Sequence, residues 1–325
     1  MLAALFCVLA AAPAACQSRS AEPESVAVET RPIALNPSDP GQMSVDRLLY
    51  RGGLKLDADW KGFGGWSALQ ISADGSRAIL VSGKGRWLTA RLGYDSEGRL
   101  SGLDAAESGI LPGLDGEPLL TGGAYTDAED LTTGADGRLI VSFERVHRLW
   151  SYPAGTPPFQ GPAQGIPVPA LMAGAPSNEG IESLTVLPDG RLLIVTEGYS
   201  DAPDTVLGWI GGAEGWAPLR MAVAGGYRPA GAASLPTGEV FLLERRFNPL
   251  DGLAVRIRRF APDEIVAGAL LEGEVLAKLS PPLTIDNFEG IALRRGPGET
   301  LIYLLSDDNL RDSQRSLLLL FALPD

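Results

Sequence analysis

The chain has 325 residues, of which 27 are Lys or Arg and 40 are Asp or Glu, so its formal net charge is −13. This charge argues against long-range attraction to nucleic acid or to an anionic membrane surface. A small anionic substrate would need a local cation to help it bind.

The first 16 residues have the form of a secretory signal peptide. The stretch from Leu2 to Pro13 is apolar and too short to span a bilayer, and small residues follow it. Ala14-Ala15-Cys16 resembles the end of a bacterial lipobox, so lipidation of Cys16 and plain cleavage near Ala15 are both open. Either outcome predicts export to the periplasm, and only a lipid on Cys16 would attach the chain to a membrane.

The leader also contains Cys7, which would be removed with it. The mature chain then has at most Cys16, which excludes an internal disulfide and a cysteine-based catalytic or metal site. Residues 17–44 are rich in Pro and Ser and predict a flexible tether. Residues 45–325 are expected to form one domain, and the protein is expected to be a monomer.

Five segments of this domain align on a turn between two apolar runs. The turns are Asp74-Gly75, Asp136-Gly137, Asp189-Gly190, Thr237-Gly238 and Pro297-Gly298. Asp-Gly between apolar runs is typical of a β-hairpin with a type I′ turn, which needs positive φ at both central residues. The spacing of roughly 50–60 residues is typical of propeller blades. The strand after each turn is almost wholly apolar, as expected where neighbouring blades cover both of its faces.

These repeats predict an all-β fold, a β-propeller of five or six four-stranded blades. The last repeat ends at the C-terminus after three strands, and residues 46–57 could supply its fourth strand and close the ring. A sixth blade would have to lie between Leu92 and Asp127. A β-sandwich or a β-helix array is the alternative. No convincing amphipathic helix is present, and the short helix-like window from Pro262 to Leu271 fits a loop.

Three acidic clusters recur where the first strand of a repeat begins. They are Asp127–Leu131, Asn178–Leu184 and Asp286–Ile291. The second strand of a hairpin ends where the first began, so a further set of groups shares this face: Lys84-Gly85-Arg86, Glu144-Arg145, Glu197, Glu244-Arg245-Arg246 and Asp307-Asp308-Asn309. These clusters are rich in oxygen ligands and contain no Cys and almost no His. Such a donor set suits a hard cation such as Ca²⁺ and disfavours zinc. The interleaved basic groups could hold a phosphate or carboxylate.

A structural role for the same groups is the alternative. Glu144 with Arg145, and Glu244 with Arg246, could be ion pairs that tie blades together. The glutamates of the acidic clusters could accept hydrogen bonds from backbone N–H groups at strand starts. His147 is the only histidine, and no Gly-x-Ser-x-Gly elbow accompanies it, which disfavours a serine hydrolase. No phosphate-binding GxxxxGK[ST] loop is present either.

From about Leu49 to the C-terminus the chain resembles a secreted bacterial family described as phytase-like, with esterase-like activity. The landmarks are Arg51-Gly-Gly-Leu-Lys-Leu, Phe63-Gly-Gly-Trp-Ser-Ala-Leu, Asp127-Ala-Glu-Asp-Leu, Ser142-Phe-Glu-Arg-Val-His-Arg, Asn178-Glu-Gly-Ile-Glu-Ser-Leu, Leu243-Glu-Arg-Arg, Asp286-Asn-Phe-Glu-Gly-Ile-Ala and Ser306-Asp-Asp-Asn-Leu-Arg-Asp-Ser-Gln. The resemblance implies a propeller related to the calcium-dependent phytases, in which carboxylate-bound Ca²⁺ ions bind substrate phosphates and activate water. Carried over, it implies five calcium ligands: Glu129, Glu182, Glu289, Asp307 and Asp308.

Two hypotheses follow from the residues and the resemblance together. The first is a Ca²⁺-dependent phosphoesterase that acts on a small anionic ester. In it Glu182 and Asp307 are needed for turnover, and Lys84, Arg145 and Arg245 contact the substrate. The alternative is a non-catalytic propeller of the cell envelope that binds a ligand or a protein. An enzyme would gather its ligands around one open cation position, whereas a binder would show its charges paired off.

Overall fold

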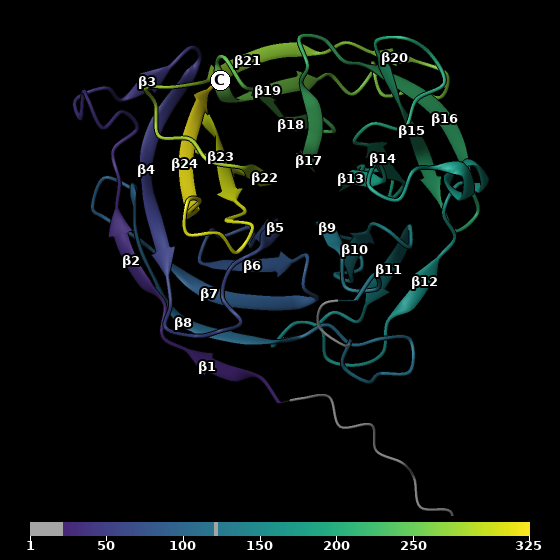
Figure 1. Ribbon diagram of the computed structural model, residues 1–325, viewed down its shortest axis with the longest axis horizontal. Coiled ribbons are helices and arrows are strands. Elements are labelled where there is room, and N and C mark those ends of the chain that lie inside the picture. The colour runs from purple at the N-terminus through teal and green to yellow at the C-terminus, as the bar shows by residue number, and fades with distance from the viewer. Residues whose placement is uncertain (1–21, 120–122) are drawn as a thin grey trace, which may run out of the picture.

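The computed structural model describes residues 22–119 and 123–325, and shows five sheets arranged in a ring (Figure 1). This is the arrangement of a β-propeller, whose blades surround a central channel. We number the sheets as blades in chain order. Blade 1 contains β5 (Trp66–Ile71), β6 (Arg77–Ser82), β7 (Arg86–Tyr94), β8 (Leu100–Ile110) and, at its outer edge, β1 (Glu24–Val26). Blade 2 contains β9 (Ala128–Thr133), β10 (Leu139–Phe143), β11 (Arg148–Tyr152) and β12 (Gln164–Ile166).

The remaining blades complete the ring. Blade 3 contains β13 (Ile181–Val186), β14 (Leu192–Thr196), β15 (Thr205–Gly212), β16 (Gly215–Ala222) and β20 (Leu270–Leu271). Blade 4 contains β17 (Arg228–Ser234), β18 (Val240–Asn248), β19 (Gly252–Phe260) and β21 (Glu274–Leu279). Blade 5 contains β22 (Phe288–Gly296), β23 (Glu299–Ser306), β24 (Ser316–Pro324), β4 (Leu48–Asp57) and β2 (Glu29–Pro32), with β3 (Ser44–Val45) paired to β4. The innermost strands are β5, β9, β13, β17 and β22, and each contacts the next around the ring.

The prediction of a β-propeller closed by an N-terminal strand is confirmed, and the number of blades is five. Strand β4 pairs antiparallel with the C-terminal strand β24, with Leu54 opposite Leu318. The described residues between Leu92 and Asp127 hold no sixth blade, because the strand that lies wholly within them, β8, is the fourth strand of blade 1. The window from Pro262 to Leu271 is a turn leading into β20. Among the described residues the one helix is the short 3-10 turn η1 (Ala170–Gly174).

Two segments of residues 17–44, the stretch expected to be a flexible tether, form strands that pair with the propeller. Strand β1 pairs with β8, with Ser25 opposite Glu107, and β2 pairs with β4 along the outside of blade 5. These short strands satisfy backbone groups of two exposed sheet edges, which explains why a Pro-rich and polar segment docks. The leader and Cys16 lie outside the described residues. Within them, no helix is long and apolar enough to cross a membrane.

Five clusters of buried apolar side chains hold the ring together, and each lies between two adjacent blades. Blades 1 and 2, for example, share Trp87, Phe143 and Tyr152. A strand such as β24, buried from Ser316 to Leu323, therefore has an apolar neighbour on both faces. This arrangement is the physical reason for the continuous apolar runs in the sequence.

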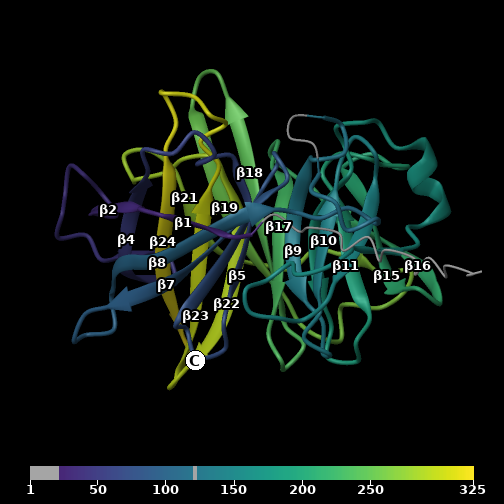
Figure 2. The ribbon, with the colours of Figure 1, turned by 90° about the horizontal axis from the view of Figure 1, so that it is seen from below.

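The hairpin turns all lie at one face, which we call the turn face, together with the C-terminus (Figure 2). Their type differs from the prediction. Only the glycine of each turn has positive φ, for example Gly75 at 77° and Gly137 at 78°. The preceding Asp74 instead accepts a hydrogen bond from the N–H of Ser76, 3.0 Å away. The Asp side chain thus stabilises a turn with one left-handed residue rather than two.

Closure of blade 5 gives the first testable prediction. Leu319 in β24 is fully buried, whereas Leu49 in β4 of the same blade is 38% exposed. We expect Leu319→Ala to lower the free energy of unfolding by about 2–5 kcal/mol, and Leu49→Ala by less than about 0.5 kcal/mol. Urea unfolding followed by circular dichroism measures both. Equal effects of the two substitutions would contradict ring closure at this strand pair.

Candidate functional site

A β-bulge occurs at the same position in all five inner strands. In β13, for example, Ile181 lies opposite Thr196 and Ser183 opposite Val195, so Glu182 is the extra residue. The bulge positions are Ser67, Glu129, Glu182, Ala230 and Glu289. A bulge redirects a side chain out of the ordinary alternation of a strand. In three of five blades the redirected side chain is a glutamate.

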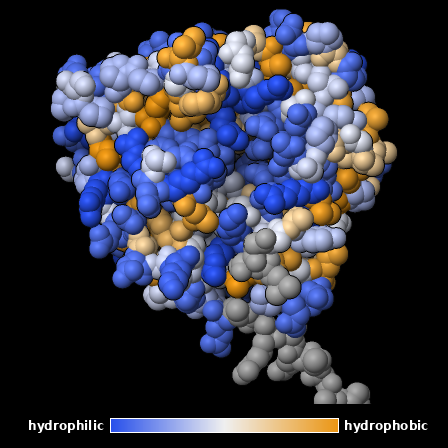
Figure 3. All heavy atoms as spheres, in the orientation of Figure 1, coloured by the Kyte–Doolittle hydropathy of each residue, from blue (hydrophilic) through white to orange (hydrophobic). Residues whose placement is uncertain are grey.

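These glutamates meet other acidic groups at the end of the channel opposite the turn face. We call this group the acidic chamber, and its members are Asp127, Glu129, Glu144, Glu182, Glu197, Glu289 and Asp307. On this side of the molecule, hydrophilic side chains gather around a central hollow (Figure 3). Arg245 lies among the carboxylates: its Nη2 is 3.3 Å from an oxygen of Glu289 and 3.5 Å from an oxygen of Glu197.

Burial and crowding raise the pKa values of several of these groups. Burial, with repulsion from neighbouring carboxylates, raises the pKa of Glu129 and of Glu182 well above the usual range. Burial also raises the pKa of Glu144 and of Glu289 to about 7, and that of Asp307 to about 6. Burial alone would lower the pKa of Arg245, but the surrounding carboxylates raise it. The chamber therefore holds an excess of negative charge that favours protons or a bound cation.

Three members of the chamber have the geometry of a cation site. One oxygen each from Asp127, Glu129 and Glu144 lies within 4.8 Å of the others. Two oxygens bound to one Ca²⁺ at about 2.3–2.6 Å can be at most about 5 Å apart. The residues present thus fit a hard cation. The backbone N–H of Gly180 donates to the second blade's Glu144 at 2.8 Å and fixes that carboxylate in place.

Lys84 and Asp308, two further predicted site residues, have different surroundings. Lys84 lies near Asp307, and its positive charge lowers the pKa of that carboxyl. Asp308 faces structural partners instead: it accepts hydrogen bonds from the N–H groups of Gly65 and Leu310 and from the hydroxyl of Ser316. Its oxygens are therefore committed to holding the loop before β24.

The sequence suggested ion pairs between Glu144 and Arg145 and between Glu244 and Arg246, but each of these residues has another partner. Arg145 pairs with Asp127, with 2.5 Å between Nε and a carboxylate oxygen, rather than with Glu144. Glu244 is fully buried between Arg256 and Arg258 of β19, and Arg246 lies 3.7 Å from Asp251. The only histidine of the sequence, His147, lies against the carbonyl of Pro176, 3.0 Å from Nε2.

Asp130 belongs to one of the acidic clusters, but the sequence did not indicate its role. It directly follows Glu129, at a position where the other inner strands have Ala68, Ser183, Gly231 and Gly290. Its buried carboxylate accepts hydrogen bonds from the N–H groups of Leu131 at 2.8 Å, Leu184 at 2.7 Å and Ala232 at 3.1 Å. One side chain thus joins the inner strands of blades 2, 3 and 4. Burial raises its pKa to about 8, although the three donors oppose this shift.

Asp127, Glu144 and Glu197 are chamber members that the sequence placed on this face but did not single out. Glu144 and Glu197 each directly follow a second strand, after Phe143 and Thr196. Their common position one residue beyond the strand end was the signal that could have selected them.

A cleft of about 980 Å³ adjoins the chamber. Five arginines line it, together with Glu197, Asn287 and Phe247: Arg228, Arg245, Arg246, Arg311 and Arg315. Arg315 pairs with Asp286 at 3.0 Å. Arg228 and Arg311 form no ion pair with any described residue. The cleft is thus a basic surface beside an acidic one.

The fold and the site define the class of protein: a five-bladed β-propeller with a carboxylate-rich chamber at one end of its channel. Residues 61–310 match the family described as "Phytase-like: Esterase-like activity of phytase", and the chain belongs to this family.

Several solved structures are similar to this chain. A gluconolactonase from Xanthomonas campestris is 12% identical, with 94% of this chain and 99% of the other covered and a TM-score of 0.44. A luciferin-regenerating enzyme is 11% identical, with 89% and 95% covered and a TM-score of 0.42. A virginiamycin B lyase from Staphylococcus aureus is 11% identical, with 92% and 89% covered and a TM-score of 0.39. A comparison with curated proteins found no match.

The raised pKa values predict how stability depends on pH. The folded chain holds protons on Glu144 and Glu289 up to a pKa of about 7, whereas the unfolded chain releases them near the ordinary value of 4.5. In EDTA the free energy of unfolding should therefore fall as pH rises from 4.5 to 7, by roughly 1–3 kcal/mol per group.

Urea unfolding at several pH values measures this slope. Glu289→Gln, which resembles the protonated form, should flatten it, while Glu214→Gln on the exposed surface should leave it unchanged. A parent profile that rises with pH through this window would contradict the assignment.

Proposed function

We propose that this protein is an exported, periplasmic hydrolase of small anionic esters, and more specifically a phosphoesterase that uses a divalent cation, Ca²⁺ by its donor set. The observation that carries the proposal is the acidic chamber, where carboxylates with raised pKa values lie beside a cleft lined by arginines. Membership of the phytase-like family supports a hydrolase. Only a lipid on Cys16 would attach the protein to a membrane.

The cation would be held by Asp127, Glu129 and Glu144, whose oxygens are close enough together for one ion. When bound, it would make water more acidic and offset negative charge that develops on the substrate. Asp308 is left out of the proposed cation site, because its carboxylate accepts structural hydrogen bonds.

The chain's own residues then have distinct tasks. Arg228 and Arg311 bind the anionic group of the substrate, since guanidinium groups pair well with phosphate oxygens. Lys84 and Arg245 lie closer to the carboxylates and orient the reacting group. Arg145 holds Asp127 in position.

Two carboxyl groups with different proton affinities suit general acid–base catalysis. Asp307, with a pKa of about 6, is mostly ionised at neutral pH and takes a proton from the attacking water. Burial raises the pKa of Glu182 well above its usual range, which suits this residue to donate a proton to the leaving alcohol oxygen as the bond from that oxygen to phosphorus breaks. Water's oxygen forms the new bond to phosphorus, so one proton is taken up and one is given.

A non-catalytic binding propeller is the second candidate. The observation that favours it is the pairing of Arg245 with Glu197 and Glu289, because it compensates part of the charge in the chamber. This candidate predicts ligand binding without turnover.

Activity measurements separate the two candidates. With 4-nitrophenyl phosphate and Ca²⁺, we expect Glu182→Gln and Asp307→Asn each to lower kcat by about 10²–10⁴-fold, as for loss of a general acid or base. Both substitutions are nearly isosteric, so circular dichroism and the unfolding midpoint should stay close to those of the parent. Glu214→Gln is the matched surface control and should hydrolyse at the parent rate. Turnover by both chamber variants at the parent rate would rule out the catalytic roles.

A further inference from the structure

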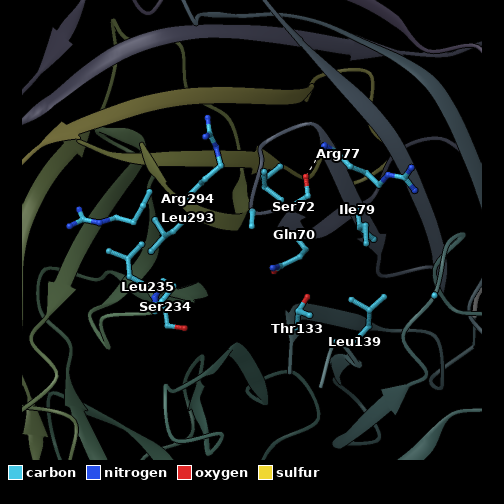
Figure 4. Close-up of a pocket in the computed structure, with 16 residues that line it drawn as sticks. Gln70, Ser72, Arg77, Ile79, Thr133, Leu139, Ser234, Leu235, Leu293 and Arg294 are labelled. Carbon is cyan, nitrogen blue, oxygen red and sulfur yellow. Dashed lines mark hydrogen bonds between the residues drawn. The ribbon is translucent and has the colours of Figure 1, made fainter. Parts of the chain in front are cut away.

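A second pocket is drawn in close-up in Figure 4. Its lining includes Ala73, Gly137 and Pro236 of three hairpin turns, so it lies at the turn face, at the opposite end of the channel from the acidic chamber. Its volume is about 530 Å³, within the range of small-molecule sites. A neighbouring cavity of about 310 Å³ shares Gln70, Thr133, Ser234 and Leu293 with it. Asp130 lies one residue beyond Glu129 on β9 and joins three inner strands between the two ends.

The charge of this pocket is opposite to that of the chamber. Three arginines line it, Arg77, Arg294 and Arg295, and neither cavity has an Asp or Glu in its lining. Arg295 pairs with Asp325 at 2.9 Å. Arg77 and Arg294 form no ion pair with any described residue. The chain as a whole has a net charge of −13, whereas this opening has two guanidinium groups without an ion-pair partner, so its local charge is positive.

The side chain of Arg294 also packs closely against the chain. Its guanidinium lies against Gly75 of the β5–β6 turn, where a Cβ would come within 2.7 Å of Nε. That Nε is buried and has no hydrogen-bond partner. A side chain that packing already restricts loses less conformational entropy when it binds an anion.

The wall of the pocket is mainly aliphatic. In the close-up, Gln70 and Thr133 lie in the middle, with Leu235 and Leu293 on one side and Ile79 and Leu139 on the other (Figure 4). The side chains of Gln70 and Thr133 make no hydrogen bond with described residues, so an amide and a hydroxyl are available to a ligand. An apolar wall, a few neutral polar groups and a cationic rim together match one class of molecule.

We propose that the turn-face pocket binds a small amphipathic carboxylate, with its apolar body against Leu235 and Leu293 and its carboxylate at Arg294 on the rim. The site is separate from the acidic chamber and does not depend on the proposed hydrolase activity. The positive charge of the arginines favours an anion. The leucines and isoleucines of the wall favour a ligand with an alkyl or aromatic body over one that is polar throughout.

Isothermal titration with octanoate tests the proposal on the mature chain. We expect saturable binding of octanoate, and at least about tenfold weaker binding of the uncharged 1-octanol and of the short acetate ion. Arg294→Ala should weaken octanoate binding about tenfold or more, because a charge-assisted hydrogen bond is lost. Leu293→Glu, which adds a negative charge to the wall, should abolish it.

Arg191→Ala is the matched control, because Arg191 lies at another hairpin of the turn face and pairs with Asp189. It should bind octanoate as the parent does, and so should Asp127→Asn in the acidic chamber. Absence of saturable binding, equal binding of 1-octanol, or equal loss in Arg191→Ala and Arg294→Ala would each overturn the proposal. Loss of binding in Asp127→Asn would place octanoate at the other end of the channel and overturn it too.

Discussion

The site depends on a bulge repeated in every inner strand. Around a propeller channel the inner strands pack side by side, and the regular alternation of a β-strand directs successive side chains towards the two neighbouring blades in turn, as Ala68 and Leu69 show. The extra residue breaks this alternation at one level of the ring. Because Glu129, Glu182 and Glu289 occupy that level, carboxylates from three blades share one space.

Crowding of carboxylates has an energetic cost, and the surrounding structure offsets part of it. Arg245 lies between Glu197 and Glu289, and Arg145 lies on Asp127. The rest of the repulsion is relieved by protons, which raises the pKa values, or by a cation. Five clusters of apolar side chains between the blades stabilise the fold and so offset the remaining cost of the chamber. At the other end of the channel the charge is reversed, so the same ring presents an acidic and a basic opening.

The fold was largely predictable because its causes are periodic. The five turns, the apolar second strands and the acidic cluster starts recur at similar spacing, and the closing strand was predicted from the missing fourth strand of the last repeat. The docking of residues 24–32 was not predictable, because it depends on free sheet edges that exist only once the blades form.

The site was predictable in its location and less so in its contacts. Glu129, Glu182 and Glu289 could be found because they occupy equivalent positions. The partners of Arg145 and Glu244 could not, since they depend on side-chain directions across blades. The role of Asp130 could not be predicted, because it comes from N–H groups of two other blades, which its own repeat does not reveal.

The central claim is that the acidic chamber binds a divalent cation in place of protons. Its most direct test is calorimetric titration of Ca²⁺ at pH 6.5 in two buffers of different ionisation enthalpy, which counts the protons released per ion. The account predicts saturable binding with net proton release, because burial raises the pKa of Glu129 well above its usual range and that of Glu144 to about 7, and a bound cation favours the ionised carboxylates. It also predicts the loss of both signals in Asp127→Asn. Binding without proton release, or no binding, would contradict it and leave the carboxylates as a self-paired structural network.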